Sequence, residues 1–345
     1  MRFYKKDFFL TAYLVIGTLV LISVLIPPKT FWPAIVLGYL IPLVLVSNLL
    51  VALWLLFMKR NLRSCLYAAS LLLVTVPFWR VTVSLSQHED HEKSISLLSY
   101  NVKLFREPDT YDKFSKELIR FVKKDTADIK CLQEFSTNAR WPALDVKQQI
   151  LNEGYQGFTM TANAAKYGDH SPGMAIFSKF PLLDSGIVLQ SKGGINGIIY
   201  ADVLIDTDTL RLYNVHLSSY QLSENKAANF LHRGMDVLRQ GVAVVREHSK
   251  ELEALQNHVL ACKVPYIIAG DFNESPYSYH YFQLRKWANA FEKKGSGFGW
   301  TLVKPPLFAR IDHIFFGGQV QAHAFVVENQ VGGSDHYPIY FNFSL

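Results

Sequence analysis

The sequence predicts an α/β domain that is preceded by a helical membrane anchor. Three long apolar runs occupy the first 85 residues, which carry eight lysines and arginines but one acidic residue. The other 260 residues alternate short apolar strands with amphipathic helices, the pattern of an α/β protein. That length is sufficient for one domain with a sizeable core. We therefore expect an anchor at 1–85, a linker at 86–94 and a single folded domain at 95–345.

The anchor is predicted to contain about three transmembrane helices. Phe8–Ile26 is almost wholly apolar, and at about 1.5 Å per residue it spans a bilayer core of roughly 30 Å. Pro33–Phe57 is a second run of that kind. Cys65–Trp79 is shorter, and it reaches spanning length if it extends to Val83 while Arg80 snorkels to the interface. The first run is not followed by the small-residue cleavage site of a signal peptide.

Basic residues predict the orientation of the anchor. They cluster before the first run and between the second and third, whereas the loop between the first and second holds one lysine. By the positive-inside rule, three crossings place the domain outside the cytoplasm, in the periplasm if this is the inner membrane of a bacterium. If the third run does not span, the domain faces the cytoplasm. The basic residues on which this orientation rests are Arg2, Lys5, Lys6, Lys29, Lys59, Arg60 and Arg63.

The net charge of +6 comes from the anchor and not from the domain. Residues 86–345 hold 27 basic and 28 acidic side chains, a net charge of −1. The basicity is therefore a topology signal, which disfavours a nucleic-acid scanning role. The cysteines, Cys65, Cys131 and Cys262, imply neither a disulfide framework nor a structural zinc site.

Helices are predicted between the strands of the domain. Tyr111–Lys124 has the apolar spacing of an amphipathic helix, and Asn225–Ala261 is a long helical stretch that could break near Gly241. The segment 84–94 is polar and reads as the connection between the anchor and the domain.

Several predicted strands deliver one polar side chain at an end. Strand ends are where the sites of α/β proteins gather, so we expect these side chains to meet. The strands, each with its polar residue, are Ile95–Val102 (Asn101), Ala127–Glu134 (Glu134), Leu210–Leu217 (His216), Pro265–Asp271 (Asp271) and Ile311–Phe316 (Asp312).

Two turns add the groups that phosphoester chemistry requires. Gly270–Asn273 carries an aspartate and an asparagine, and Ser334–Pro338 carries an aspartate and a histidine. Hydrolysis of an anionic phosphodiester needs a cation, a carboxylate that activates water and an imidazole that handles the leaving-group proton. Oxygen ligands from Asp, Glu and Asn select Mg²⁺ or Mn²⁺. Taken alone, the turn at Asp271 fits an Asx turn as well as a site, and the other residues are more typical of a cap, a core histidine or a surface pair.

In this order the motifs resemble the endonuclease/exonuclease/phosphatase superfamily, over roughly Ile95 to Leu345. That group includes deoxyribonuclease I, exonuclease III, neutral sphingomyelinases and inositol polyphosphate 5-phosphatases. The resemblance implies its four-layer fold, a sandwich of two β-sheets flanked by helices. One motif would be a weak signal, but the ordered series is specific. The matching segments are Asn101, Gln133-Glu134, Gly173–Lys179, Asn214–Leu217, Gly270–Asn273, Ile311–Ile314 and Ser334–His336.

The resemblance also implies a role for each polar residue. Glu134, with Asn101 and Asp335, would hold a catalytic Mg²⁺ or Mn²⁺. Asp271 would orient or deprotonate the attacking water, while Asn273 would hydrogen-bond the phosphoryl oxygen.

The two histidines would serve the leaving group. His336, its tautomer fixed by Asp312 or Asp335, would stabilise developing charge or transfer a proton. His216 would contact phosphate and assist the leaving oxygen; the sequence leaves open which histidine is the acid. His170, His232, His280 and His313 have no comparable support for a catalytic role, and we interpret them as structural or surface residues.

We therefore expect a membrane-anchored, metal-dependent phosphodiesterase that acts on lipid headgroups or other envelope phosphoesters. An extracytoplasmic nuclease acting on DNA or RNA and a catalytically silent scaffold are the alternatives. The expected partners are the bilayer, through the anchor helices, and the phosphoester substrate; no protein partner is evident. Two loops near the expected site, Ser191–Gly197 and Glu292–Trp300, could approach lipid, the second with Phe298 and Trp300, although such aromatic residues are more often packing residues.

Overall fold

The computed structural model describes residues 2–58, 61–86, 94–107, 113–162, 171–219, 230–304 and 307–345. They form two compact units, Met1–Val83 with Pro276–Leu284, and Ser84–Ser275 with Arg285–Leu345. We expected a boundary at 85 and an uninterrupted second domain. The two compact units divide after Val83, and Pro276–Leu284 groups with the first; the expected bounds of the anchor and the domain stay a prediction. Most of the expected linker, at 87–93, lies outside the described residues.

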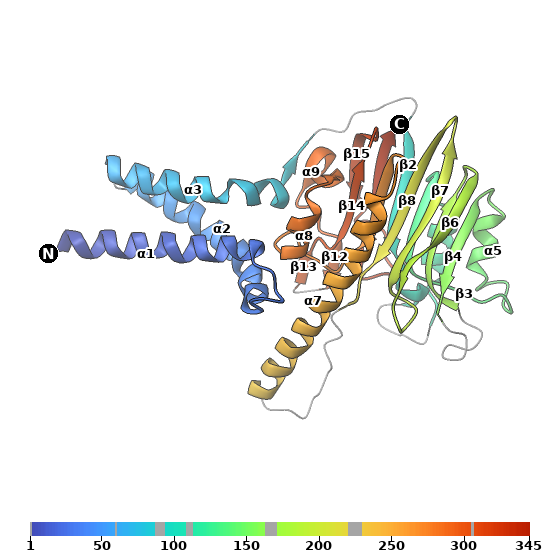
Figure 1. The fold of residues 1–345 in the computed structure, drawn as a ribbon, viewed down its shortest axis with the longest axis horizontal. Coiled ribbons are helices and arrows are strands. Elements are labelled where there is room, and N and C mark those ends of the chain that lie inside the picture. Colours follow the sequence, from blue (N-terminus) through green and yellow to red (C-terminus); the bar gives the residue numbers. More distant parts are fainter. Residues whose placement is uncertain are drawn as a thin grey trace. The chain divides into compact units, whose positions relative to one another are not determined.

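The first unit consists of helices (Figure 1). Three of them are long and apolar enough to cross a membrane. The expected third run, Cys65–Trp79, lies within a longer helix, Leu62–Thr82. Asn61 caps its N-terminus by accepting a hydrogen bond from the backbone of Ser64. The elements are α1 (Arg2–Ile22), η1 (Ser23–Leu25), α2 (Pro33–Met58), α3 (Leu62–Thr82) and α8 (Tyr279–Leu284).

The segment Pro276–Leu284 joins this unit through aromatic side chains. Tyr277 and Phe282 pack against a buried cluster that includes Ile41 of α2 and Phe78 of α3. The ring centroids of Phe78 and Phe282 lie 5.3 Å apart. No sequence pattern indicates this assignment, because an apolar segment of a domain helix has the same composition.

The second unit is a sandwich of two mixed six-stranded sheets, as expected. One sheet has the order β15-β16-β2-β3-β5-β4, and the other has β10-β14-β9-β8-β7-β6. β2 and β3 are parallel, as are β8 and β9, and the other neighbours are antiparallel. The strands are β2 (Ile95–Asn101), β3 (Ile129–Thr137), β4 (Gln156–Thr161), β5 (Ser171–Ser178), β6 (Leu182–Gln190), β7 (Gly197–Ile205), β8 (Asp208–His216), β9 (Tyr266–Asp271), β10 (Ala288–Asn289), β14 (Asp312–Gly317), β15 (Gln321–Val327) and β16 (Ile339–Ser344).

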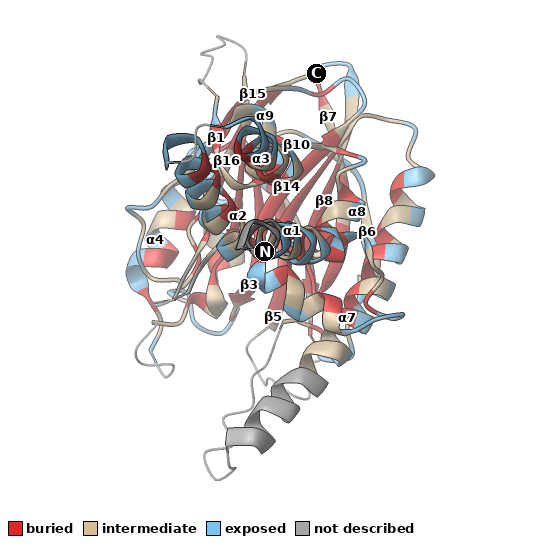
Figure 2. Cartoon of the chain, turned by 90° about the vertical axis from the view of Figure 1, so that its left-hand side faces the viewer, coloured by how far each residue is buried: buried red, intermediate tan, exposed pale blue. Residues whose placement is uncertain are grey.

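Alternation along the strands builds the layers. In β2, Leu97 faces the core between the sheets, whereas Leu98 and Tyr100 belong to the cluster beneath the helices. The central strands of both sheets are correspondingly buried over most of their length (Figure 2), whereas β4 and β6 at the sheet edges are mostly not. Helices α4 (Lys116–Lys124) and α5 (Val146–Leu151) contribute to that second cluster, and α7 (Phe230–Leu260) contacts β6 and β7 of the other sheet.

Two helix expectations need adjustment. α4 begins at Lys116, where Ser115 caps it by accepting a hydrogen bond from the backbone of Leu118. The expected start at 111 lies outside the described residues. α7 continues past Gly241 without the break we anticipated, because one glycine costs only about 1 kcal/mol in a helix of this length.

Gly270 and Gly241 give opposite predictions for the same substitution. Gly270 has a φ of 148°, and a Cβ there would overlap the backbone of Val215 on the neighbouring strand. We expect Gly270→Ala to lower the free energy of unfolding by ~2 kcal/mol or more. Nothing lies within 4 Å of a Cβ at Gly241, so Gly241→Ala should raise it by about 0.5–1 kcal/mol. Denaturant unfolding of the full-length protein in mild detergent measures both, and equal effects would contradict the turn geometry.

Candidate active site

Three of the expected residues form one row across the second sheet. His216 ends β8 and is paired in register with Asp271 at the end of β9, and Asp271 is paired with Asp312 at the start of β14. Each lies an even number of residues from core side chains such as Leu212 and Ile267, so all three point inward, between the sheets. They are buried, at 2%, 1% and 2% exposure.

Asn101 joins the row from the opposite sheet. Its Nδ2 donates to Asp271 Oδ2 at 3.0 Å and to Glu134 Oε1 at 3.3 Å. The backbone N–H of Lys103 donates to Asn101 Oδ1, which fixes the orientation of the amide. Asn101 therefore presents its nitrogen to both carboxylates and bridges them in this structure, and the metal-binding role expected for Asn101 stays a prediction.

Glu134 reaches the site through an irregularity in β3. The strand does not end at Glu134, as we expected, but continues to Thr137, and its register against β5 shifts between Leu132 and Phe135. Glu134 has a φ of 46°, a left-handed conformation that is costly for a non-glycine residue and typical of functional sites. The bulge turns the carboxylate toward Asn101, with the side chain 29% exposed. Burial raises the pKa of Glu134, and the hydrogen bond from Asn101 opposes that rise.

His336 is held between two aspartates. Its Nδ1 donates to Asp312 Oδ2 at 2.8 Å, and its Nε2 lies 3.7 Å from Asp271 Oδ2. Burial alone would lower the pKa of His336, but the charges of Asp312 and Asp271 outweigh it and raise the pKa to about 10. The imidazole is therefore protonated at neutral pH and acts as a donor.

His216 is the neutral counterpart of His336. Its Nε2 lies 3.7 Å from Asp271 Oδ2 and 3.8 Å from Glu134 Oε1. The amide nitrogen of Asn196 lies 3.3 Å from the same ring nitrogen. Burial lowers the pKa of His216, and the charge of Asp271 opposes that effect. The two histidines thus differ in protonation because His336 has two aspartates beside it.

Asp335 and Asn273 lie beside this centre but are engaged elsewhere. Lys103 Nζ is 3.1 Å from Asp335 Oδ2, so the expected metal ligand is part of an ion pair. Asn273, with a φ of 50°, donates its side-chain amide to Leu217 O at 3.0 Å. Its backbone N–H donates to Asp271 Oδ1 at 2.9 Å, which holds that carboxylate from the turn.

The arrangement has two places where a cation could bind. Asp271, Asp312 and His336 offer ligand atoms within 4.8 Å of one another, but Nδ1 of His336 is bonded to Asp312. The positive charge of that imidazole disfavours a cation in the same place. The Glu134 carboxylate is partly exposed, and oxygen ligands of this kind fit a hard divalent ion. Of the two places, the Glu134 side therefore suits a hard divalent cation better.

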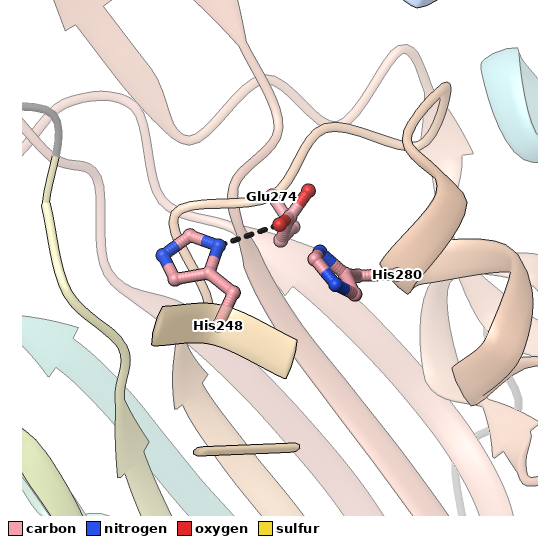
Figure 3. A group of neighbouring side chains, drawn as sticks. All are labelled: His248, Glu274 and His280. Atoms are coloured by element: carbon pink, nitrogen blue, oxygen red, sulfur yellow. Dashed lines mark hydrogen bonds and ion pairs between the residues drawn. The ribbon is translucent and has the colours of Figure 1, made fainter. Parts of the chain in front are cut away.

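A second buried pair, which the sequence did not single out, supports the loops of the site. His248 of α7 donates through Nδ1 to Glu274 Oε1 at 2.5 Å (Figure 3) and through Nε2 to Ser218 O at 2.6 Å. Both ring nitrogens carry hydrogen, and although burial lowers the pKa of His248, Glu274 raises it above its usual value. Because Ser218 follows the β8 end and Glu274 follows Asn273, His248 ties the two catalytic loops together.

Two further residues hold the same loops. Glu251, one helical turn after His248, accepts hydrogen bonds from the backbone and the hydroxyl of Ser218. His313, interpreted above as structural or surface, is buried and lies with Nε2 2.8 Å from Glu274 O. His248 and Glu251 looked like part of the solvated face of an amphipathic helix, and only tertiary packing distinguishes them.

The family of the chain follows from a comparison with known families. Residues 98–336 match the model of the Endonuclease/Exonuclease/phosphatase family. The match includes all eight residues assigned to the site from the sequence. No curated protein matches the sequence significantly.

Solved structures share the fold. The endonuclease/exonuclease/phosphatase of Beutenbergia cavernae has a TM-score of 0.54 at 17% identity, over 73% of this chain and 72% of that one. A humanized Danio rerio TDP2 has 0.52 at 17% identity, over 73% and 99%. The human Nocturnin catalytic domain with bound sulfate has 0.51 at 17% identity, over 75% and 97%. At these identities the likeness establishes the DNase I-like fold.

The His248–Glu274 pair predicts a pH-dependent stability. A pKa raised in the folded state contributes stability that is present below the unfolded value of about 6.5 and lost as pH rises through the folded pKa. We expect His248→Gln to cost about 3 kcal/mol near pH 6, because Glu274 is left buried without its cation, and less at higher pH. Unfolding of the full-length protein between pH 5.5 and 9 measures this.

Lys250→Gln on the same helix is the matched control. Lys250 pairs with Glu247 on the surface, so its loss should cost less than about 1 kcal/mol at every pH. A cost for His248→Gln that is equally small and independent of pH would show that the pair is not charged.

Proposed function

Because the chain belongs to the Endonuclease/Exonuclease/phosphatase family, whose named activities are all hydrolyses of phosphoesters, we propose that it is a membrane-tethered, divalent-metal-dependent phosphodiesterase. Its substrate is a lipid headgroup or another phosphoester of the cell envelope. The anchor holds the catalytic unit at the membrane, on the side away from the cytoplasm.

One observation supports the catalytic proposal most strongly, which is the convergence of three polar side chains on Asp271. Asn101, His216 and His336 all lie within 3.7 Å of its Oδ2, although they come from three separate segments of the chain. A buried carboxylate with this environment serves to orient and deprotonate a water molecule. The same groups argue against a silent scaffold, because the burial of so many polar groups is costly without a function.

Each group has a role in attack on phosphorus. Asp271 takes the proton of the attacking water, while Asn101 fixes the orientation of its carboxylate. His336, protonated and held by Asp312, donates to the phosphoryl oxygens as negative charge develops. His216 contacts the phosphate from the other side of Asp271. Asn273 keeps one amide hydrogen for the phosphoryl oxygen, since its bond to Leu217 uses only the other.

The metal requirement follows from the donor set around Glu134. Mg²⁺ or Mn²⁺ held by Glu134, with Asn101 and Asp335 beside it, would neutralise charge on the phosphate. Lys103, which pairs with Asp335 in this structure, would then leave that carboxylate and pair with the substrate anion. The exposed edge of Glu134 leaves room for an ion and its water ligands.

Charge supports a substrate in the envelope over nucleic acid. The net charge of residues 86–345 is −1, which offers no long-range attraction for a polyanion. A TDP2 with the same fold has been solved with a single-stranded DNA product. Cleavage of DNA is therefore the alternative outcome that the substrate assay must include.

The first test is hydrolysis by the full-length protein in detergent, with EDTA or with added Mg²⁺ or Mn²⁺. We expect metal-dependent turnover of bis-p-nitrophenyl phosphate that falls at least ~100-fold in Asp271→Asn, because the base is lost. The control is Asp184→Asn, which should retain activity. Asp184 lies on β6, where its carboxylate accepts a hydrogen bond from the Tyr200 hydroxyl.

A panel of phospholipids, sphingomyelin and plasmid DNA, assayed in parallel, identifies the substrate class. Cleavage of lipid but not DNA supports the proposal, and cleavage of DNA makes the protein a tethered nuclease. Undiminished turnover in Asp271→Asn would refute the assignment of the base.

The orientation predicts the behaviour of C-terminal fusions. Alkaline phosphatase joined after Leu345 should be active, and green fluorescent protein at the same place should be dark, because three crossings end outside the cytoplasm. Fusions that end in the loop after α2, between Met58 and Asn61, are the control and should behave in the opposite way. A fluorescent C-terminal fusion would place the catalytic unit in the cytoplasm.

A further inference from the structure

An exposed apolar tip lies on the paired strands through which the chain enters the second unit. β1 (Ser84–Leu85) pairs with β11 (Ser296–Gly297), with Ser84 opposite Gly297. Leu85, Phe298 and Trp300 are 88%, 49% and 45% exposed, and we call these three residues the tip. The rings of Phe298 and Trp300 stack, with centroids 5.0 Å apart and an interplanar angle of 14°.

The covalent chain confines the tip to the end of α3. That helix ends at Thr82, and only Val83 separates it from β1. Consecutive Cα atoms are about 3.8 Å apart, so Leu85 lies within about 11 Å of Thr82 in any arrangement of the two units. If α3 spans the membrane, as the proposed function requires, its end is at the bilayer surface. The headgroup layer is roughly 5–7 Å thick on each side, so the tip is within reach of lipid.

The backbone of the tip is held rigidly from inside the second unit. Arg310 is buried, donates through Nη1 to Phe298 O at 2.9 Å and stacks 3.6 Å above the Phe291 ring. Gly299 has a φ of 62°, and a Cβ there would collide with the same ring. Such a preformed turn loses little entropy when it binds a surface.

We propose that the tip is a bilayer-contact surface, inserted in the interfacial layer of the leaflet from which α3 emerges. Tryptophan and other aromatic side chains are enriched at that layer, because their rings combine apolar area with a polar edge. Exposed Lys293, in the last turn of α9 (Ala290–Lys294) just before β11, adds attraction to anionic headgroups. The proposal rests on the proposed membrane anchoring.

The tip is linked to the catalytic row through the next residue. Buried Thr301 accepts hydrogen bonds from the backbone of Asp312 at its Oγ1, at 3.1 Å, and from the backbone of Tyr337 at its carbonyl, at 2.7 Å. Asp312 and His336, which precedes Tyr337 in the chain, form the central hydrogen-bonded pair of the site. Lipid contact at Trp300 therefore restrains the segment that positions this pair.

Quenching by brominated lipid tests the proposal without reference to turnover. The full-length protein is reconstituted in phosphatidylcholine–phosphatidylglycerol vesicles, with and without bromine on the upper acyl chain. The emission of Trp300 is obtained by subtracting the fluorescence spectrum of Trp300→Phe from that of the wild type. The matched control is Trp141→Phe, since Trp141 is 63% exposed in the segment after β3. We expect the Trp300 emission to be lost in brominated vesicles, and the Trp141 emission to be lost only on addition of iodide.

Two other outcomes would overturn the proposal. Trp300 emission quenched by iodide and not by bromine would place the tip in water. Emission quenched by neither would mean that protein, such as a second copy of the chain, covers it. Because no activity is measured, either result leaves the phosphodiesterase proposal standing, and an inactive protein would leave the lipid contact testable.

Discussion

The hydrogen bond from Asn101 to Asp271 is the contact on which the site depends, because it joins the two sheets where their shared core turns polar. Along most of their length the inner faces carry apolar side chains, and at one end they carry Asn101, His216, Asp271 and Asp312. Buried polar groups need partners, and here Asn101 of one sheet donates to Asp271 of the other, while His336 from a turn bonds Asp312. Behind this layer, buried Asn214 of one sheet accepts from Gln133 of the other and donates to two of its carbonyls. The spacing of the sheets and the geometry of the site are thus one constraint.

Burial shifts the pKa values of the acids and of the histidine gathered there in opposite directions. Burial raises the pKa of Glu134 and Asp271 and lowers that of His216, so it favours the neutral form of each. His336 alone is driven to its charged form, by the two aspartates beside it. The site therefore carries more carboxylates than nearby cations can neutralise, and a divalent ion would restore the ionised form of Glu134. The proposed cation would therefore be favoured by the packing of the acids.

The sequence predicted those parts of the site that follow from alternation along single strands. Asn101, His216, Asp271 and Asp312 lie at strand ends in phase with core residues, which a period of two reveals. It did not predict features that depend on pairing between distant segments. The bulge at Glu134 requires the register of β3 against β5, and the orientation of the Asn101 amide depends on Lys103. The contact between His248 and Glu274 depends on the packing of α7 against the loops of the site. The grouping of Pro276–Leu284 with the first unit depends on aromatic contacts that no local sequence pattern records.

The anchor and the charge of the catalytic unit bear on the same question of substrate. Enzymes that find free polyanions use a basic surface to gather them, and residues 86–345, with a net charge of −1, have no such surplus. A spanning anchor replaces that attraction by confinement, since it raises the effective concentration of the unit for any phosphoester in the same leaflet. Confinement offers nothing toward a substrate that diffuses freely in three dimensions. A near-neutral catalytic unit behind three apolar helices is therefore better suited to a phosphoester of the membrane surface than to dissolved nucleic acid.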